Sequence, residues 1–113
     1  MWEESVKADI AVEALSALAQ EHRLALFRLL VQAGPTGMPA GAIAEALDIP
    51  NSSLSFHLGQ LQRAGLIAQR RAGRSLIYSA EYAAMNRLLD YLTENCCAGA
   101  DCAPAARTQG DKK

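Results

Sequence analysis

Cysteine is absent from the chain before Cys96, and all three cysteines then fall in the short stretch "ENCCAGADC", at Cys96, Cys97 and Cys102. An odd number of cysteines does not suit a closed set of disulfides. The Cα atoms of neighbours such as Cys96 and Cys97 lie only about 3.8 Å apart, below the distance at which unstrained disulfides begin. This distribution argues against a disulfide-stapled fold and favours a metal site or a group of reactive thiols.

The sequence also lacks a long apolar run. Half of its 113 residues are hydrophobic, but charged residues interrupt every apolar stretch before it reaches the ~20 residues that cross a bilayer. The N-terminus "MWEESVKADI" is acidic where a signal peptide would be basic and then apolar. We therefore expect one small cytoplasmic domain without a membrane partner.

Signatures of catalysis are missing as well. The chain has no glycine-rich phosphate loop, no HExxH motif and no cysteine close to a histidine in sequence. We expect no enzymatic activity and no organic cofactor.

Acidic residues are absent between Asp48 and Glu81, where the chain carries four arginines and no lysine. This interval has a charge of +4 in a chain whose net charge is −1. A local basic surface on a mildly acidic protein indicates a polyanionic partner that contacts one face only.

Helical periodicity dominates the first half of the chain. Apolar residues recur at helical spacing over residues 3–19 and 21–33, and the second stretch ends at the stop signal Gly34-Pro35. The inward face of the second helix is predicted to be Leu24, Phe27, Leu30 and Val31. A loop, "PTGMPAG", then precedes a short third helix with Ile43, Ala44 and Leu47 at helical spacing.

The stretch "DIPNSSLSFHLGQLQRAGLI" predicts a fourth helix that Asn51 or Ser52 caps and that stops at Gly65. Its inward face is predicted to be Leu54, Leu58 and Leu61. Its solvent face is predicted to be Asn51, Ser52, Ser53, Ser55, His57 and Gln60. Two short helices joined by a tight polar turn are typical of a helix-turn-helix.

The period changes after Gly65. Two strand-like runs, 66–70 and 76–79, flank residues 71–74 and predict a β-hairpin with arginines at and near its tip. Helical spacing returns over 81–95. We expect a domain over residues 1–95 and a cysteine-bearing tail over residues 96–113.

Helices followed by a basic hairpin in this order indicate a winged helix-turn-helix, mainly α with a small β-hairpin. The segments "HRLALFRLL" and "IAEALDIPNSSLSFHLGQLQRAGLIAQRRAGRSLIYS" resemble the ArsR/SmtB family of small metal-responsive repressors over roughly residues 15–80. The resemblance implies a homodimeric repressor built from four helices, a two-stranded wing and a fifth helix, with the fourth helix as the recognition helix.

Physical chemistry gives the same residues a role on double-stranded operator DNA. Hydroxyl and amide groups on the solvent face of the fourth helix suit phosphates or base edges in a major groove. Arginines on the hairpin suit the DNA backbone or a neighbouring minor groove. The predicted DNA contacts are Asn51, Ser52, Ser53, Ser55, His57, Gln60, Arg70, Arg71 and Arg74. The second histidine, His22, is expected to cap or pack the second helix.

The first and last predicted helices carry apolar stripes that a core of this size does not cover. Burial against a second copy would cover them. A two-fold dimer through these helices would present two recognition helices about 34 Å apart, one turn of DNA.

The cysteines predict a sensor. Cys96 and Cys97 stand at the end of the last helix, and "AGAD" lets Cys102 fold back toward them. Zinc prefers four ligands, and only Asp101 offers a weak fourth. Three thiolates suit trivalent arsenic or antimony, with cadmium, lead or mercury as competitors. Arsenite-responsive members of the family also use three cysteines.

The sequence departs from those members in one respect. Many carry a Cys-x-Cys pair near the recognition motif, where this chain reads "PAGAIAEAL", so the family's ligand positions do not transfer. Thiol oxidation as the signal, or a thiol-rich scavenger, remain alternative interpretations. The expected mechanism is a repressor that binds its operator when metal-free and leaves it when arsenic binds.

Overall fold

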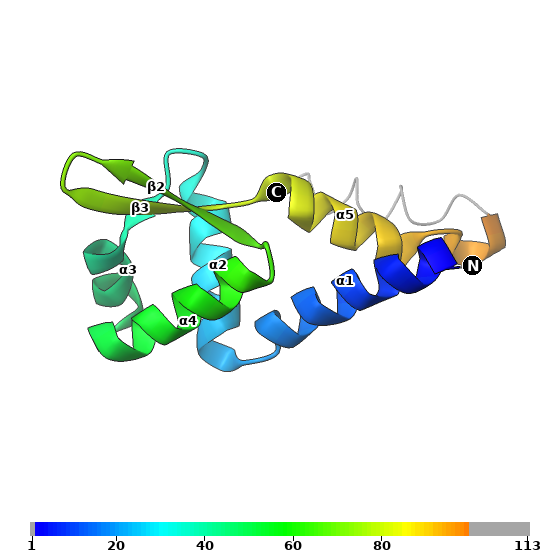
Figure 1. Cartoon of the computed structure of the whole chain (residues 1–113), viewed down its shortest axis with the longest axis horizontal. Coiled ribbons are helices and arrows are strands. Elements are labelled where there is room, and N and C mark those ends of the chain that lie inside the picture. Colours follow the sequence, from blue (N-terminus) through cyan, green and yellow to red (C-terminus); the bar gives the residue numbers. More distant parts are fainter. Residues whose placement is uncertain (1, 100–113) are drawn as a thin grey trace.

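The computed structural model describes residues 2–99, and it has five α-helices and a small antiparallel sheet over that range (Figure 1). Two helices lead the chain, α1 (Trp2–Leu18) and α2 (Glu21–Ala33), and a two-residue strand, β1 (Met38–Pro39), follows. The helix-turn-helix is α3 (Ala40–Leu47) and α4 (Asn51–Arg63). The wing is β2 (Ile67–Ala72) and β3 (Ser75–Ala80), and α5 (Tyr82–Thr93) with the 3₁₀ turn η1 (Cys96–Gly99) completes this part.

The elements form two regions. The winged helix-turn-helix occupies one end, with α2 behind α4 and the wing reaching outward, while α1 and α5 extend side by side toward the other end (Figure 1). None of the helices in the described part of the chain has the length and apolar character that a membrane span requires. The arrangement confirms the winged helix-turn-helix that the sequence predicts.

The core lies where α2, α3, α4 and the start of the wing meet. Its fully buried side chains are Leu26, Leu30, Ile43, Leu54, Leu61 and Leu66. The predicted inward face of the fourth helix is confirmed, since Leu54, Leu58 and Leu61 are all buried. Burying a leucine stabilises a fold by about 1.5–3 kcal/mol relative to leaving it exposed, so this cluster is the main support of α4.

The inward face predicted for the second helix is wrong at Leu24, which is 46% exposed, whereas Leu26 is fully buried. The cause is the run "LALFRLL", in which leucines stand on both sides of Phe27. Such a run offers two possible stripes, and the packing of α1 and α4 selects the one through Leu26 and Leu30.

The sheet has a strand that the sequence analysis assigned to a loop. Strand β1 pairs antiparallel with β3, with Met38 opposite Tyr78, so the strand order is β1-β3-β2. The hairpin strands are also longer than predicted, because Ala72 pairs with Ser75 and leaves only Gly73-Arg74 in the turn. Strand β1 thus fixes strand β3 of the wing to the segment directly before α3.

The beginnings of two helices differ in detail from the prediction. Neither Asn51 nor Ser52 caps α4, because Pro50 occupies the N-cap position and makes no side-chain hydrogen bond there. At α2 the cap is Gln20, whose side-chain oxygen accepts a hydrogen bond from the Arg23 backbone at 3.0 Å. His22 is exposed at the surface of α2 and does not cap it.

Candidate DNA-binding surface and thiol cluster

The N-terminal half of α4 presents small polar side chains to solvent. Asn51, Ser52, Ser53 and Ser55 are all exposed, as the sequence predicts. Gln60, one turn or more further along, is half-buried, and its side-chain oxygen accepts a hydrogen bond from Arg63. The accessible polar groups therefore gather at the first two turns of α4, the part of a recognition helix that enters a groove.

His57 is not part of this solvent face. The side chain is 8% exposed, so the prediction that it faces away from the core is wrong. The reason is helical geometry: His57 follows Leu54 by three residues and precedes Leu61 by four, which places it on the buried stripe. The leucine spacing contained this signal, although the sequence analysis did not use it.

His57 is held between charged and aromatic neighbours. Its Nδ1 lies 3.3 Å from Nη1 of Arg23, and its ring centroid lies 5.6 Å from that of His22. Burial, and then the positive charges of Arg23 and His22, lower the pKa of His57 below its usual 6.5. A neutral imidazole is therefore favoured in the folded protein, which suits a packing role better than a phosphate contact.

Phe56 takes the outward position instead. It is 55% exposed, and it follows Ser52 by four residues and Ser53 by three, so it shares their face of the helix. Phe56 is not among the DNA contacts predicted from the sequence. The same spacing that buries His57 predicts this exposure.

The wing supplies the positive charge. Arg70, Arg71 and Arg74 are all exposed on or beside the hairpin. Arg70 donates a hydrogen bond to the backbone carbonyl of Thr36 at 2.8 Å, which ties the wing to the loop before β1. Within residues 2–99, the guanidinium groups of Arg71 and Arg74 make no hydrogen bond. These two guanidinium groups are available to a polyanion, while Arg70 also has a structural contact.

The predicted metal ligands are only partly within the described structure. Cys96 is a free, half-buried thiol, Cys97 is disulfide-bonded, and Cys102 lies outside the described residues. Among residues 2–99, no three His, Cys, Asp or Glu side chains lie together as a metal site requires. The three-cysteine site therefore stays a prediction.

The backbone around Cys96 and Cys97 has already left helical geometry. Helix α5 ends at Thr93, and Asn95, Cys97 and Ala98 have φ values of 58°, 58° and 54°. A left-handed backbone at residues other than glycine is incompatible with a regular right-handed helix. Cys96 and Cys97 thus stand on a turn, where their directions are not fixed by a regular helix.

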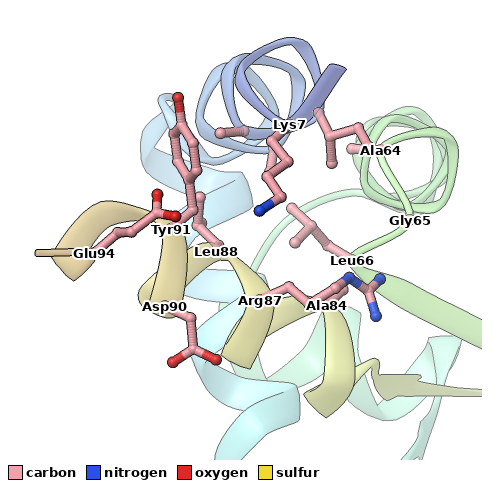
Figure 2. A pocket seen from close by; sticks show the side chains of 13 residues that line it. Lys7, Ala64, Gly65, Leu66, Ala84, Arg87, Leu88, Asp90, Tyr91 and Glu94 are labelled. Carbon is pink, nitrogen blue, oxygen red and sulfur yellow. The ribbon is translucent and has the colours of Figure 1, made fainter. Parts of the chain in front are cut away.

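A pocket of about 300 Å³ separates α5 from α1 beside the junction of α4 and β2. Figure 2 shows the Lys7 side chain reaching into this space from α1, opposite Leu66 and Leu88. Its walls also include Ala84 and Tyr91, together with Arg87 and Asp90 on α5 and Glu94 directly after this helix. Helix α5 therefore lies over a hollow on the side that faces α1, close to the turn that carries Cys96.

Comparison with known proteins agrees with this arrangement. A family model described as a helix-turn-helix domain matches residues 18–70. The transcriptional activator HlyU of Vibrio cholerae is 34% identical over 85 residues, which cover 73% of this chain and 76% of HlyU. The solved ArsR-like transcriptional regulator from Rhodococcus sp. RHA1 has a TM-score of 0.70 at 26% identity, over 90% of this chain and 92% of that one. The chain belongs to the ArsR family of transcriptional regulators.

Membership of the ArsR family settles the broad class: a DNA-binding transcriptional regulator and not an enzyme. A putative arsenical resistance operon repressor of Halobacterium salinarum is also similar, at 37% identity over 70 residues. That match covers 62% of this chain and only 52% of the halobacterial protein. The relatives of this ArsR-family chain thus include a transcriptional activator and a putative repressor.

Proposed function

We propose that this ArsR-family regulator is a dimeric repressor that occupies operator DNA when free of effector and leaves it when trivalent arsenic binds Cys96, Cys97 and Cys102. The observation that carries the proposal is the position of the cysteines: they form the only cysteine cluster of the chain and follow directly on α5. The similarity to a putative arsenical resistance operon repressor supports the same effector.

The ligand set selects the effector. Three thiolates satisfy trivalent arsenic or antimony, whose lone pair takes the fourth direction, whereas zinc prefers four ligands. The turn at residues 95–98 supports the proposal because its non-helical backbone leaves Cys96 and Cys97 free of the divergent directions that a helix imposes. Cadmium, lead and mercury are the competitors to be compared with arsenic.

Dimerisation through α1 and α5 is part of the proposal. Large apolar side chains on both helices face solvent in a single chain: Ile10, Val12, Leu15, Leu89 and Leu92 are between 41% and 63% exposed. A second copy packed on these helices would remove the apolar area from water. The same dimer would place two α4 helices on successive major grooves of a palindromic site.

The dimer would also link effector binding to a change in DNA affinity. Arsenic at the end of α5 would order the turn and shift α5, and the hollow between α5 and α1 gives this helix room to move. A shift of α5 at the dimer interface changes the spacing of the two recognition helices. Linkage then requires DNA to weaken arsenic binding by the same factor by which arsenic weakens DNA binding. The corresponding coupling free energy is typically ~1–3 kcal/mol.

The proposal is tested by counting thiols and following DNA in one titration. The reduced protein is mixed with a labelled duplex from upstream of its own gene, and arsenite or zinc is added stepwise. Protection of three thiols per chain from alkylation by arsenite, together with loss of the DNA complex, is the expected result. Protection of the thiols in a protein with little affinity for the duplex would instead indicate a thiol-rich scavenger, and protection without DNA release would contradict the arsenic switch.

A second candidate signal is thiol oxidation, which the disulfide-bonded state of Cys97 favours. In that case the oxidised and reduced proteins differ in DNA affinity, and arsenite has no effect beyond trapping the reduced thiols. Comparing the two redox states in the absence of arsenite separates this signal from the arsenic switch.

A further inference from the structure

Phe56 is the large apolar residue on the exposed face of the recognition helix. The side chain is 55% exposed, while its neighbours Leu54 and Leu58 are buried at 1% and 3%. The exposed serines of the first two turns surround its position, and no acidic residue occurs between Asp48 and Glu81. An apolar ring at the centre of a polar, DNA-facing surface requires an apolar partner to leave water.

The ring of Phe56 packs against the ring of His57. Its centroid lies 5.6 Å from that of His57 at an interplanar angle of 64°, an edge-on aromatic contact. His57 is itself buried and lies within reach of the Arg23 guanidinium on α2. The histidine therefore gives one side of the Phe56 ring a packed neighbour within the fold.

Only one group on the base edges of a major groove is apolar, and that is the C5-methyl of thymine. The other base edges there carry hydrogen-bond donors or acceptors that a phenyl ring cannot satisfy. We propose that Phe56 reads a thymine methyl group in each half-site of the operator. This inference rests on the proposed DNA-binding function and adds the chemistry of one base position to it.

The serines and Phe56 then have different tasks. Ser52 and Ser53 share the face of Phe56 and suit phosphates or polar base edges, which position the helix. Phe56 adds discrimination, because replacing thymine by cytosine beneath the ring would remove the methyl group and present an amino group to it. Thymine at one position of each half-site is the expected signature.

The test replaces thymine by deoxyuridine, which removes the methyl group and leaves base pairing unchanged. Each symmetric pair of thymines in the operator duplex is substituted in turn, and affinity is measured by fluorescence anisotropy at fixed salt. At one pair of positions, wild type is expected to lose about fourfold per methyl group, or roughly fifteenfold for both half-sites, which corresponds to ~0.8 kcal/mol per buried methyl.

Two variants complete the experiment. Phe56→Ala should bind the thymine duplex more weakly and show no further loss with deoxyuridine. Leu76→Ala removes another exposed apolar side chain, on the wing at 36% exposure, and should keep the full deoxyuridine effect. The inference is overturned if wild type ignores deoxyuridine at every position, or if Phe56→Ala retains the same loss. Absence of salt-dependent binding by wild type is a different result, which would overturn the DNA-binding proposal itself and this inference with it.

Discussion

Nη1 of Arg23 lies 3.3 Å from Nδ1 of His57, so an arginine on α2 contacts the buried face of the recognition helix. The same guanidinium donates through Nε to the backbone carbonyl of Ala17 at 2.6 Å, near the end of α1. Arg23 thereby connects a helix of the proposed dimer interface with the helix that meets DNA. The position of α4 depends on this polar contact as well as on its leucines.

The burial of His57, together with the positive charge of Arg23 beside it, predicts a loss of stability in mild acid. The folded protein has a lowered His57 pKa, so below pH 6.5 the unfolded chain binds a proton that the folded chain resists. The free energy of unfolding should fall as pH decreases from 6.5 toward the lowered value, by at most about 1.4 kcal/mol per pH unit for one group. Urea unfolding at several pH values measures this slope, and His57→Gln should lose it. An equal slope in wild type and His57→Gln would assign the acid sensitivity to other groups.

The two leucines near the start of α2 form a matched pair. Leu26 is fully buried and Leu24 is 46% exposed. We expect Leu26→Ala to lower the free energy of unfolding by about 2–5 kcal/mol, because it leaves a cavity in the core. Leu24→Ala should cost less than about 1 kcal/mol in the same denaturant titration. A larger loss of stability in Leu24→Ala than in Leu26→Ala would instead support the inward face predicted from the sequence.

Comparing alanine variants of Gly37 and Gly34 distinguishes the effect of a steric clash from that of backbone strain. Both have positive φ, 75° and 90°, but a Cβ on Gly37 would overlap the carbonyl oxygen of Tyr78, whereas a Cβ on Gly34 meets nothing within 4 Å. Both alanine variants should be destabilised by the strain, of order 1–3 kcal/mol, and Gly37→Ala by more. Thermal unfolding compares them. Equal melting temperatures would contradict the close approach of Gly37 to Tyr78 on β3.

The wing predicts a change in the salt dependence of DNA binding. If Arg71 contacts one phosphate in each protomer, Arg71→Ala should reduce the slope of log K against log salt by about 1.8 for the dimer. Arg28→Ala removes an exposed arginine from α2 and should leave the slope unchanged. Anisotropy titrations at four or five salt concentrations give both slopes. A wild-type slope in Arg71→Ala would remove this residue from the interface.

Sequence periodicity predicts the helices of this chain well, because each has a local signal. Helix α2 occupies the predicted residues 21–33 since Gly34-Pro35 stops it, and the leucines of α4 are spaced for one buried stripe. Strand β1 has only two residues, one of them Pro39, and exists through its pairing with Tyr78 and Ile77. No local pattern marks a strand that a distant hairpin creates.

The residues of the candidate sites also divide into those with a local sequence signal and those whose position depends on distant contacts. Exposed serines and wing arginines are predictable from patterning, because each depends on local position alone. The exchange of roles between His57 and Phe56 is harder to predict: His57 lies on the buried leucine stripe, and the polar contact that it finds there comes from Arg23 on another helix. Polarity alone favours an exposed His57 and a buried Phe56. The leucine spacing on α4 is the sequence feature that indicates the opposite.

The affinity of the reduced protein for its operator duplex, with and without arsenite, is the decisive measurement for the proposed arsenic switch. We expect tight, salt-dependent binding without arsenite, release when arsenite is added, and no release in Cys102→Ser. Zinc at the same concentration should leave the complex intact. Tight DNA binding that arsenite does not weaken would contradict the arsenic switch, and the cysteines would then be assigned to another metal or to oxidation.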